Sequence, residues 1–590
     1  MNGSEYSEIA GEPSRALAEP QRRATQPHRL WSDVKRGLHV TPALTYLDWA
    51  LATVLALLMF CLCIYQADTV SLWYDEAWSY GIATAPLTST VHYYFARGFS
   101  NMMAYHLFLH GWLGLSHLLH IPPDELYMRL PSAIAIALSV AVLYLFGRRF
   151  FGRVAGLVAA LAYMLNGIVL QDAQQVRAYA PELLLAILSW YALAVALESS
   201  GQPDKQRSRA TRGWWVLYSA VATLAIYTHL FMTLNLAAQA LAVGFLLVAP
   251  GPWRKQARFA LKAFVTSCVA IIVLSAPILT LAIIGGSPNT WVPVPTPKDL
   301  PPMLLNLTGG SAALALSYLS LGFVASGLLV AALAKTPLMS RLDGWTLPLG
   351  SEQLPGKASR TLALAPVRAP ASGISLLVFW AAGTLLLSYI VSQKAIGEHF
   401  FYYRYENVTI PAICLLIGVG VSSLRWRVAQ AVAVIALLAL LASVPGVYYQ
   451  HAQSQDFRTP SLWLKAHYQS GDGIVCTDGT SCSIPMDYYL GAYPPSAAQF
   501  DPDSPGAFFW ATRRGVASDV SALPAYSAAH QRVFLVVFRP ASGSPLSASA
   551  QSMKEWYDAH YALLGSRQTT TESVYLYNTA SPLTPASQAP

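Results

Sequence analysis

The chain has 590 residues, of which 54% are hydrophobic and 12% are charged, and its formal net charge is +8. Soluble globular domains usually carry about 25% charged residues, so this composition excludes an ordinary soluble domain. Apolar runs of about 17–23 residues recur along the chain, and each is long enough to cross a hydrocarbon core of about 30 Å. We therefore predict an α-helical polytopic membrane protein, whose basic residues set its topology and do not indicate nucleic-acid binding.

The N-terminal residues 1–46 are polar and rich in Pro, Ser, Glu and Arg, which predicts a disordered tail. Its basic residues favour a cytoplasmic location, because positive charge is retained on that side of the membrane. The first span is predicted at 49–66. The loop 67–129 that follows is therefore expected outside.

A second apolar stretch, Asn101 to His120, lies within that outer loop. If it crossed the membrane, Arg148, Arg149 and Arg153 after the next span would lie outside, against the positive-inside rule. Histidines interrupt the stretch at near-helical spacing, and two prolines end it. We interpret it as an amphipathic helix that lies at the interface without spanning.

With that assignment, every later basic loop falls on the inner side. The cytoplasmic linker 335–372 is predicted to be flexible, because it is rich in Pro, Ser and Arg. The eleven spans define a transmembrane domain over 47–447. After the first span at 49–66, they are predicted at 130–147, 154–170, 178–197, 214–230, 231–249, 263–284, 313–334, 373–391, 407–424 and 428–447.

The tail 448–590 is then expected outside, as a small extracytoplasmic α/β domain with a disordered end. Strand-like runs occur at Gly473–Thr477, Val533–Phe538 and Val574–Tyr577, and helical runs near 460–469 and 549–562. Cys476 and Cys482 would form a short disulfide loop in an oxidising compartment, but their spacing alone leaves the paired and free states open.

The most informative stretch is Ser71–Tyr80, directly after the first span, where Asp75 and Glu76 lie among four large aromatic residues. The aromatics alone are typical of a membrane-interface belt, and the acids could be solvated or paired with Arg97. Carboxylates held near the membrane are costly unless they are used or paired. Asp75 is positioned to act as a general base on an acceptor hydroxyl or amine at the interface.

The segment Trp73-Tyr74-Asp75-Glu76 resembles the aspartate–glutamate signature of the GT-C superfamily of integral-membrane glycosyltransferases. The resemblance is closer to the group that holds the bacterial protein mannosyltransferase-like enzymes and the lipid A aminoarabinose transferases, and it covers about residues 45–450. Further similar segments are Arg129-Leu130-Pro131-Ser132-Ala133, Ala173 to Tyr179, Tyr227-Thr228-His229, and Tyr403-Arg404-Tyr405 before the span that contains Pro411.

This resemblance implies a GT-C-like fold and an inverting transfer of a sugar from a polyprenyl-phosphate donor. It makes Asp75 the catalytic base and Glu76 a supporting group or a contact to the acceptor. The acceptor would be a lipid, a glycan or a protein, on the outer face of a bacterial inner membrane. The resemblance implies no cofactor and leaves a divalent metal open. Neither the sugar nor the acceptor can be identified from these residues.

The donor is an anion, so the outer interface must supply cations. Arg404 and Arg177 are both predicted outside at span ends, and guanidinium groups bind phosphate through two hydrogen bonds. The alternative is that they only reach lipid head groups. Further candidates for substrate binding are Trp73, Tyr74, Trp78, Tyr179, His229, Tyr403 and Tyr405, although a lone histidine such as His229 is more often structural.

His106 and His110 are four residues apart and share one helix face, but neither a metalloprotease-type Glu nor a clear third ligand accompanies them. The alternative functions are a transporter or flippase of lipid-linked sugars, which would carry charged or broken segments near the midplane of the membrane, and a non-catalytic scaffold. The candidate charges gather instead at the outer span ends, which favours the enzyme.

Overall fold

The computed structural model describes residues 44–97, 101–200, 205–248, 252–285, 292–308, 371–394, 396, 399–422, 424, 427–451, 455–491, 498–539 and 544–583. The predicted span at 313–334, nearly all of the tail at 1–46 and most of the linker at 335–372 lie outside these residues.

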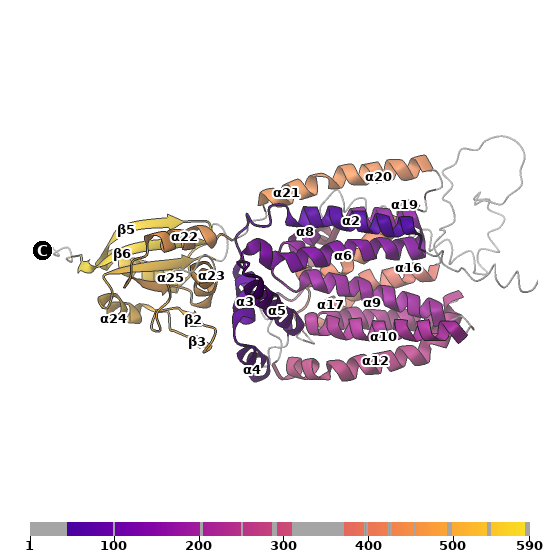
Figure 1. The fold of residues 1–590 in the computed structure, drawn as a ribbon, viewed down its shortest axis with the longest axis horizontal. Coiled ribbons are helices and arrows are strands. Elements are labelled where there is room, and N and C mark those ends of the chain that lie inside the picture. The colour runs from indigo at the N-terminus through magenta and orange to yellow at the C-terminus, as the bar shows by residue number, and fades with distance from the viewer. Residues whose placement is uncertain are drawn as a thin grey trace, which may run out of the picture. The chain divides into compact units, whose positions relative to one another are not determined.

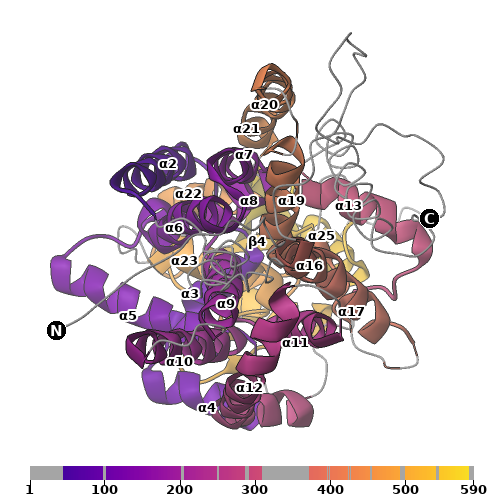
Figure 2. The same ribbon diagram turned by 90° about the vertical axis from the view of Figure 1, so that its right-hand side faces the viewer.

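The membrane part is built around four long helices: α2 (Tyr46–Ile64), α6 (Glu125–Phe151), α9 (Tyr179–Ser200) and α10 (Lys205–Thr228). α6 packs between α2 and α9, and α10 packs against α9, as Figure 1 and the end-on view in Figure 2 show. Their facing side chains form one continuous apolar core.

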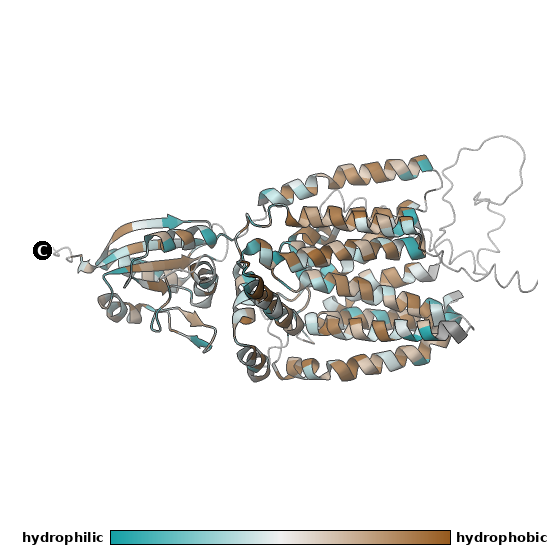
Figure 3. Ribbon diagram, viewed as in Figure 1, coloured by the Kyte–Doolittle hydropathy of each residue, from teal (hydrophilic) through white to brown (hydrophobic). Residues whose placement is uncertain are grey.

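The ribbons of the bundle helices are coloured largely as hydrophobic in Figure 3, and many of their large apolar residues are exposed. On α12 (Pro252–Gly285), the exposed fractions of Val269, Ile272 and Val273 are 55%, 61% and 64%. A soluble protein rarely exposes such a continuous apolar face, whereas a lipid-facing helix requires one. The outward surface of α12 is thus suited to hydrocarbon.

The remaining membrane-part elements are shorter. They are α7 (Arg153–Met164), α8 (Gly167–Ala173), α11 (Met232–Val248), η1 (Pro297–Asp299), α13 (Leu300–Thr308), α16 (Ala371–Val378), η2 (Phe379–Gly383), α17 (Thr384–Val391), α18 (Tyr403–Glu406), η3 (Asn407–Thr409), α19 (Ile410–Ser422), α20 (Arg427–Leu441) and α21 (Ser443–His451). A Cβ atom added at Gly418 of α19 would lie 2.2 Å from the carbonyl oxygen of Ala155, so glycine permits the close packing of α19 on α7.

The described residues contain seven helices that are long and apolar enough to cross a membrane, or eight if the bent pair α7 and α8 is one span. The predicted number was eleven. The predicted spans at 214–230 and 231–249 do form helices, but α10 carries basic residues through its first turns and α11 has only 17 residues. The predicted span at 154–170 is bent by 66° between α7 and α8.

The loop between α2 and α6 folds into three helices, α3 (Tyr74–Thr84), α4 (Leu87–Arg97) and α5 (Met103–Leu119). α5 corresponds to the apolar stretch that was predicted not to span, and it is not among the candidate spans. α3 packs against α5 and against a helix of the C-terminal part. The loop is therefore a structured layer that begins at the Asp75 motif.

The C-terminal part contains a four-stranded mixed sheet in the order β1-β4-β6-β5. Its strands are β1 (Gly473–Cys476), β4 (Arg532–Phe538), β5 (Tyr561–Gln568) and β6 (Glu572–Pro582). β1 runs parallel to β4, whereas β6 is antiparallel to both β4 and β5. Three of these strands match the predicted runs, and β5 was not predicted.

Alternate residues of β4 face opposite sides of the sheet, as the period of a strand requires. Val533 and Leu535 join an apolar cluster with Met553 of α25 (Ala548–His560). Phe534 and Val536 join a second cluster, which includes residues of α22 (Arg458–His467) and α23 (Thr480–Gly491). Both faces of the sheet are therefore covered by helices.

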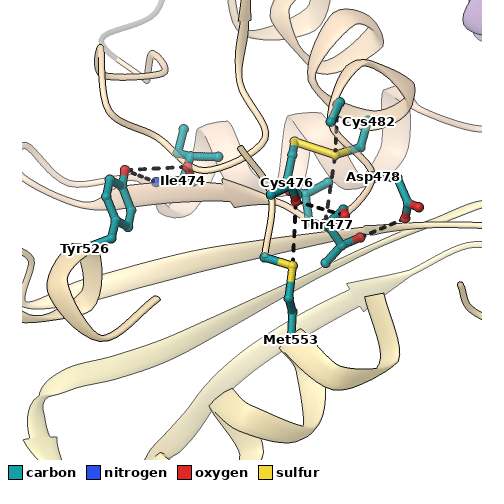
Figure 4. The surroundings of a disulfide bond; sticks show 10 residues. Ile474, Cys476, Thr477, Asp478, Cys482, Tyr526 and Met553 are labelled. Atoms are coloured by element: carbon teal, nitrogen blue, oxygen red, sulfur yellow. Dashed lines mark hydrogen bonds between the residues drawn. A yellow bond between two sulfur atoms is a disulfide. The ribbon is translucent and has the colours of Figure 1, made fainter. Parts of the chain in front are cut away.

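The remaining C-terminal elements are short: β2 (Phe508–Phe509), β3 (Arg514–Gly515), η4 (Val520–Ala522) and α24 (Leu523–Ala528). Cys476 and Cys482, which the sequence left open, are joined by a disulfide between the end of β1 and the first turn of α23 (Figure 4). The other cysteines of the chain are free.

Candidate active site

α3 begins at the Asp75 motif, and its first turn separates the two acids. Glu76 Oε2 accepts a hydrogen bond from the Trp73 backbone N–H at 3.1 Å, which closes the start of the helix. Asp75 and Glu76 both lie in this first turn, where the helix dipole favours negative charge. The helix start thus presents the adjacent carboxylates to different surroundings.

Glu76 is buried and fully engaged. Arg129, at the start of α6, donates to it from Nε at 3.1 Å and from Nη2 at 2.9 Å. The Val176 backbone N–H donates to Glu76 Oε1 at 2.8 Å. A bidentate pair of this kind holds both partners in one orientation. Glu76 therefore joins α3, α6 and the segment before α9.

Asp75 lies in more open surroundings, and 32% of its side chain is exposed. Its Oδ2 atom is 3.7 Å from Nη2 of Arg177 and 3.9 Å from Nη1 of Arg404. These separations exceed the usual length of a charge-assisted hydrogen bond. The structure thus brings the three predicted residues together and leaves the Asp75 carboxylate without a tight cationic partner.

The two arginines are held by different groups. The Arg404 guanidinium lies 4.4 Å from the ring centroid of Trp73, and its Nε atom donates to the Tyr403 hydroxyl at 3.0 Å. Arg177 Nη1 donates to Ser79 Oγ at 3.2 Å and to the carbonyl oxygen of Asp75 at 3.3 Å. Both guanidinium groups are thus oriented beside Asp75.

Burial opposes the charge of Arg177, but the nearby Asp75 and Tyr179 outweigh that effect and raise its pKa. His106 of α5 contacts Ser79 from another side, with 3.4 Å between Nε2 and Oγ. Burial, together with the charge of Arg177, lowers the pKa of His106 to about 3. At neutral pH the site therefore has charged arginines and a neutral histidine.

The predicted aromatics separate into two groups. Tyr179, His229 and Tyr405 are buried together, and the His229 ring centroid lies 5.9 Å from Tyr179 and 5.2 Å from Tyr405. His229 Nδ1 lies 3.2 Å from Oε1 of the buried Glu182, and its Nε2 lies 3.4 Å from the Asn101 side chain. His229 is thus held in a polar core beside the arginine-bearing segments.

Tyr74 and Trp78 instead contact the C-terminal part. The Trp78 ring packs edge-on against Trp510 at 5.2 Å and parallel to Phe508 at 6.4 Å. The Tyr74 hydroxyl lies 3.5 Å from Thr480 Oγ1. These two aromatics connect α3 to the α/β part.

Comparison with known proteins matches this architecture to one family. Residues 106–279 match the dolichyl-phosphate-mannose-protein mannosyltransferase family. Over these residues, the chain is similar to the membrane glycosyltransferases of that family. This match agrees with the family resemblance, the enzyme class and the use of polyprenyl-phosphate sugars that the sequence predicts, and it does not include Trp73–Glu76.

The two solved structures of ArnT share the fold of this chain. ArnT from Cupriavidus metallidurans bound to undecaprenyl phosphate has a TM-score of 0.51 and 14% identity, over 90% of this chain and 98% of that chain. The apo state of ArnT gives a TM-score of 0.50 and 13% identity, over 89% and 97%. The oligosaccharyltransferase AglB from Archaeoglobus fulgidus gives 0.43 and 11%, over 90% and 74%. No curated protein matches the chain by sequence.

Sequence reasoning assigned no role to two residues that build this candidate site. Arg129 was noted only as part of a similar segment, and its position at the start of an apolar span was the available signal. Ser79, one turn after Asp75, was not noted, although its Oγ contacts both Arg177 and His106. Helical spacing from Asp75 could have suggested Ser79, but nothing in the sequence pairs it with Arg177.

Among the described residues, no group of three or more His, Cys, Asp or Glu side chains could hold a metal ion. His106 bonds to the Tyr94 hydroxyl, and His110 Nδ1 donates to the carbonyl oxygen of Ala83 at 2.7 Å. The two histidines that share a helix face are thus engaged in separate hydrogen bonds.

Proposed function

We propose that this enzyme is an inverting glycosyltransferase that moves a sugar from a polyprenyl-phosphate donor to an acceptor on the outer face of a bacterial inner membrane. The observation that carries the proposal is the position of Asp75, partly exposed between Arg177 and Arg404 at the start of α3. Sugar transfer from a phosphate donor requires a base for the acceptor and cations for the phosphate, and here a carboxylate lies within 4 Å of two guanidinium groups.

In this reaction Asp75 accepts the proton of the acceptor hydroxyl or amine. The freed electron pair attacks the anomeric carbon of the sugar from the face opposite the phosphate. The bond from that carbon to the phosphate oxygen breaks, and the polyprenyl phosphate leaves with the bonding electrons. One displacement from the opposite face inverts the anomeric carbon, and general-base catalysis of this kind contributes about 10²–10⁴-fold.

Arg177 and Arg404 would hold the donor phosphate and stabilise the negative charge that it gains on leaving. Their loose contacts with Asp75 support this role, because each guanidinium keeps N–H groups that can turn toward a phosphate. Fixed cations at a developing charge usually supply the largest share of catalysis. Tyr403 and Trp73 would orient Arg404, and Tyr179 would orient Arg177.

We propose a supporting role for Glu76 instead of a share in proton transfer. Both of its oxygens already accept hydrogen bonds from Arg129 and backbone N–H groups, and its side chain is buried. A carboxylate in a buried bidentate pair is a poor proton acceptor, because protonation would leave the guanidinium unpaired.

The topology proposed with this function places the N-terminus in the cytoplasm and the C-terminal part outside. Arg148 and Arg149 lie in the last turn of α6, at the end that is distant from Arg129, and Arg153 begins α7, as the positive-inside rule requires for a cytoplasmic side. Asp75 and the C-terminal part then share the outer side, where the contacts of Trp78 join them.

The flippase alternative would be favoured by charged or broken segments at the midplane. The structure does contain a broken span, at α7 and α8, and buried carboxylates in other spans. However, Asp172 ends α8 and pairs with Asn407, while Glu182 lies in the first turn of α9 beside His229. These carboxylates belong to the span ends that carry Arg177 and Arg404, which supports the enzyme.

The test is sugar transfer from a panel of radiolabelled polyprenyl-phosphate sugars in membranes, with wild type and Asp75→Asn at equal expression. We expect one sugar to be transferred by wild type, and Asp75→Asn to lower the rate by about 10²–10⁴-fold. Anomeric NMR of the product would report inversion.

Equal transfer by both proteins would reject Asp75 as the base, and retention of the anomeric configuration would reject the single displacement. If wild type moves intact labelled lipid between leaflets of proteoliposomes and transfers no sugar, the flippase alternative replaces this proposal.

A further inference from the structure

The segment Ala67–Trp73, here called the strap, connects the end of α2 to the start of α3 without regular secondary structure. Asp75 follows it directly, so the conformation of the strap sets where α3 begins. Backbone groups outside helices and sheets need partners from elsewhere when they are buried. In the strap, several of those partners come from residues that lie between 58 and 417 positions away.

Each backbone N–H group from Leu72 to Tyr74 donates to a different hydrogen-bond acceptor. The Leu72 N–H donates to the Tyr489 hydroxyl at 2.8 Å, and the Tyr74 N–H donates to Gln455 Oε1 at 3.0 Å. The intervening Trp73 N–H is accepted by Glu76. Two of these three acceptors thus belong to the C-terminal part.

The carbonyl groups of the strap are capped by two arginines. Arg129 of the membrane part donates to the carbonyls of Ala67, Val70 and Ser71. Arg458, the first residue of α22, donates to those of Asp68, Thr69 and Val70. Ser71 Oγ also accepts from the backbone N–H groups of Phe457 and Arg458, at 3.1 and 3.2 Å. The membrane part and the C-terminal part hold the strap jointly.

Tyr489 is itself fixed on its other side. Its hydroxyl donates to Glu125 Oε1 at 3.0 Å, and Arg458 Nε donates to the same oxygen at 2.8 Å. Burial raises the pKa of Tyr489, so the hydroxyl keeps the proton that it donates to Glu125. The Leu72 N–H is therefore bonded to an acceptor whose orientation is already determined.

The body of α3 has a second contact with the C-terminal part. A Cβ atom added at Gly81 would lie 2.0 Å from Cε2 of Trp510. Only glycine allows the indole to lie directly on the α3 backbone. The helix that carries Asp75 is thus held at its start by Tyr489 and Gln455, and along its side by Trp510.

We infer that the C-terminal part is a positioning element of the catalytic centre, and that Tyr489 and Gln455 are positioning residues for Asp75. The inference rests on the proposed role of Asp75 as the base. Their hydrogen bonds set the register of the strap, and through it the distance from Asp75 to Arg177 and Arg404. Arg404 stacks on Trp73 of the strap, but the Trp73 N–H is accepted by Glu76 and not by Tyr489 or Gln455, so we expect donor binding to change less than the catalytic rate.

Tyr489→Phe removes one hydroxyl and leaves the ring, and Tyr488→Phe is its matched control. The neighbouring Tyr488 also lies at this interface, but its hydroxyl donates to the Pro123 carbonyl instead of bonding to the strap. We expect Tyr489→Phe to lower kcat by about five- to tenfold, the equivalent of its hydrogen bond with the Leu72 N–H, with donor KM changed less than about twofold. Tyr488→Phe should keep wild-type kcat.

Hydrogen–deuterium exchange of the strap peptide provides a readout that needs neither donor nor acceptor. Tyr489→Phe should exchange about five- to tenfold faster over residues 67–76, while Tyr488→Phe matches wild type there. Because this measurement involves no chemistry, it decides the positioning role even if Asp75→Asn retains transfer and the proposed base fails.

Gln455 supplies an independent pair of variants should Tyr489→Phe fail to fold. Gln455→Leu removes the acceptor of the Tyr74 N–H, whereas Gln455→Glu keeps an oxygen at the same reach. We expect faster strap exchange and lower kcat with leucine, and recovery of both with glutamate. Wild-type strap exchange in Tyr489→Phe and Gln455→Leu would overturn the inference. So would faster exchange with unchanged kcat, or a rise in donor KM that accounts for the whole loss.

Discussion

The described residues contain two clusters in which one aspartate faces two arginines: Asp48 lies in the first turn of α2, and Asp75 follows the other end of that helix. In the first, Asp48 is fully buried, and its Oδ1 atom is 2.9 Å from Arg148 Nε and 2.9 Å from Arg153 Nη2. The Tyr144 hydroxyl donates to the same oxygen at 3.2 Å. In the second, Asp75 is one-third exposed and 3.7 and 3.9 Å from Arg177 and Arg404.

The differences in distance and exposure distinguish a cluster that stabilises the fold from one that can bind and activate substrate. Thr45 donates to the second oxygen of Asp48, so every direction around that carboxylate is occupied. Asp75 keeps room for a proton donor, and its arginines keep N–H groups for an anion. Residue types are the same in both clusters, so distance and exposure indicate which one can bind substrate.

Lysine substitutions at Arg177 and Arg404 are expected to have the largest effect that distinguishes the two clusters. Lysine keeps the charge but loses the paired N–H groups that a phosphate accepts. We expect Arg404→Lys or Arg177→Lys to raise the donor KM or lower kcat/KM by at least about tenfold, the equivalent of one charge-assisted hydrogen bond. The measurement is initial transfer rate against donor concentration.

Arg153→Lys at the closed cluster is the matched control, because Arg153 is the more exposed arginine beside Asp48. Its kcat/KM per folded molecule should equal that of wild type. An equal loss in Arg153→Lys and Arg404→Lys would break the distinction between the clusters.

Asp48→Asn tests the closed cluster directly. The change leaves Arg148 beside a neutral amide within a packed contact, so the unfolding temperature in detergent should fall by a few degrees. The transfer rate per folded molecule should stay near that of wild type. Asp75→Asn should show the reverse, with an unchanged unfolding temperature and lost transfer. A stable but inactive Asp48→Asn would contradict the structural role of the Asp48 cluster.

A third carboxylate can be compared with Asp48 and Asp75, because it is buried without a nearby cation. Glu572 of β6 is fully buried, and neither of its oxygens has a hydrogen-bond partner among the described residues. Burial, with a contribution from Asp456, raises its pKa well above the ordinary value of 4.5. Between the two pKa values, the folded state therefore retains a proton that the unfolded chain releases. The contribution of Glu572 to the free energy of unfolding is thus most favourable below about pH 4.3 and becomes less favourable as the pH rises toward the folded pKa.

Glu572→Gln removes this ionisation and keeps the shape. We expect the variant to unfold a few degrees above wild type at pH 8 and to converge with wild type as the pH falls toward 4.5. Differential scanning calorimetry of the full chain at both pH values is the measurement. A difference between the two proteins that does not depend on pH would show that Glu572 retains its ordinary pKa.

Much of the architecture could be predicted from local patterns. Long apolar runs indicated α2, α6, α9 and α12, and short strand-like runs indicated β1, β4 and β6. The number of spans could not be predicted in the same way, because run length does not reveal the bend between α7 and α8. β5 was missed because most of its residues lie exposed beside β6 and follow no clear apolar alternation.

The sequence alone determined the membrane class and the grouping of Asp75, Arg177 and Arg404 as candidates, because span ends and aromatic belts leave a local signal. Only the tertiary structure decided which acid is free. Asp75 and Glu76 are neighbours with similar chemistry, and Arg129, 53 positions after Glu76, neutralises just one of them. The strap contacts of Tyr489 and Gln455 were likewise decided by packing, because hydrogen bonds between residues hundreds of positions apart leave no local pattern.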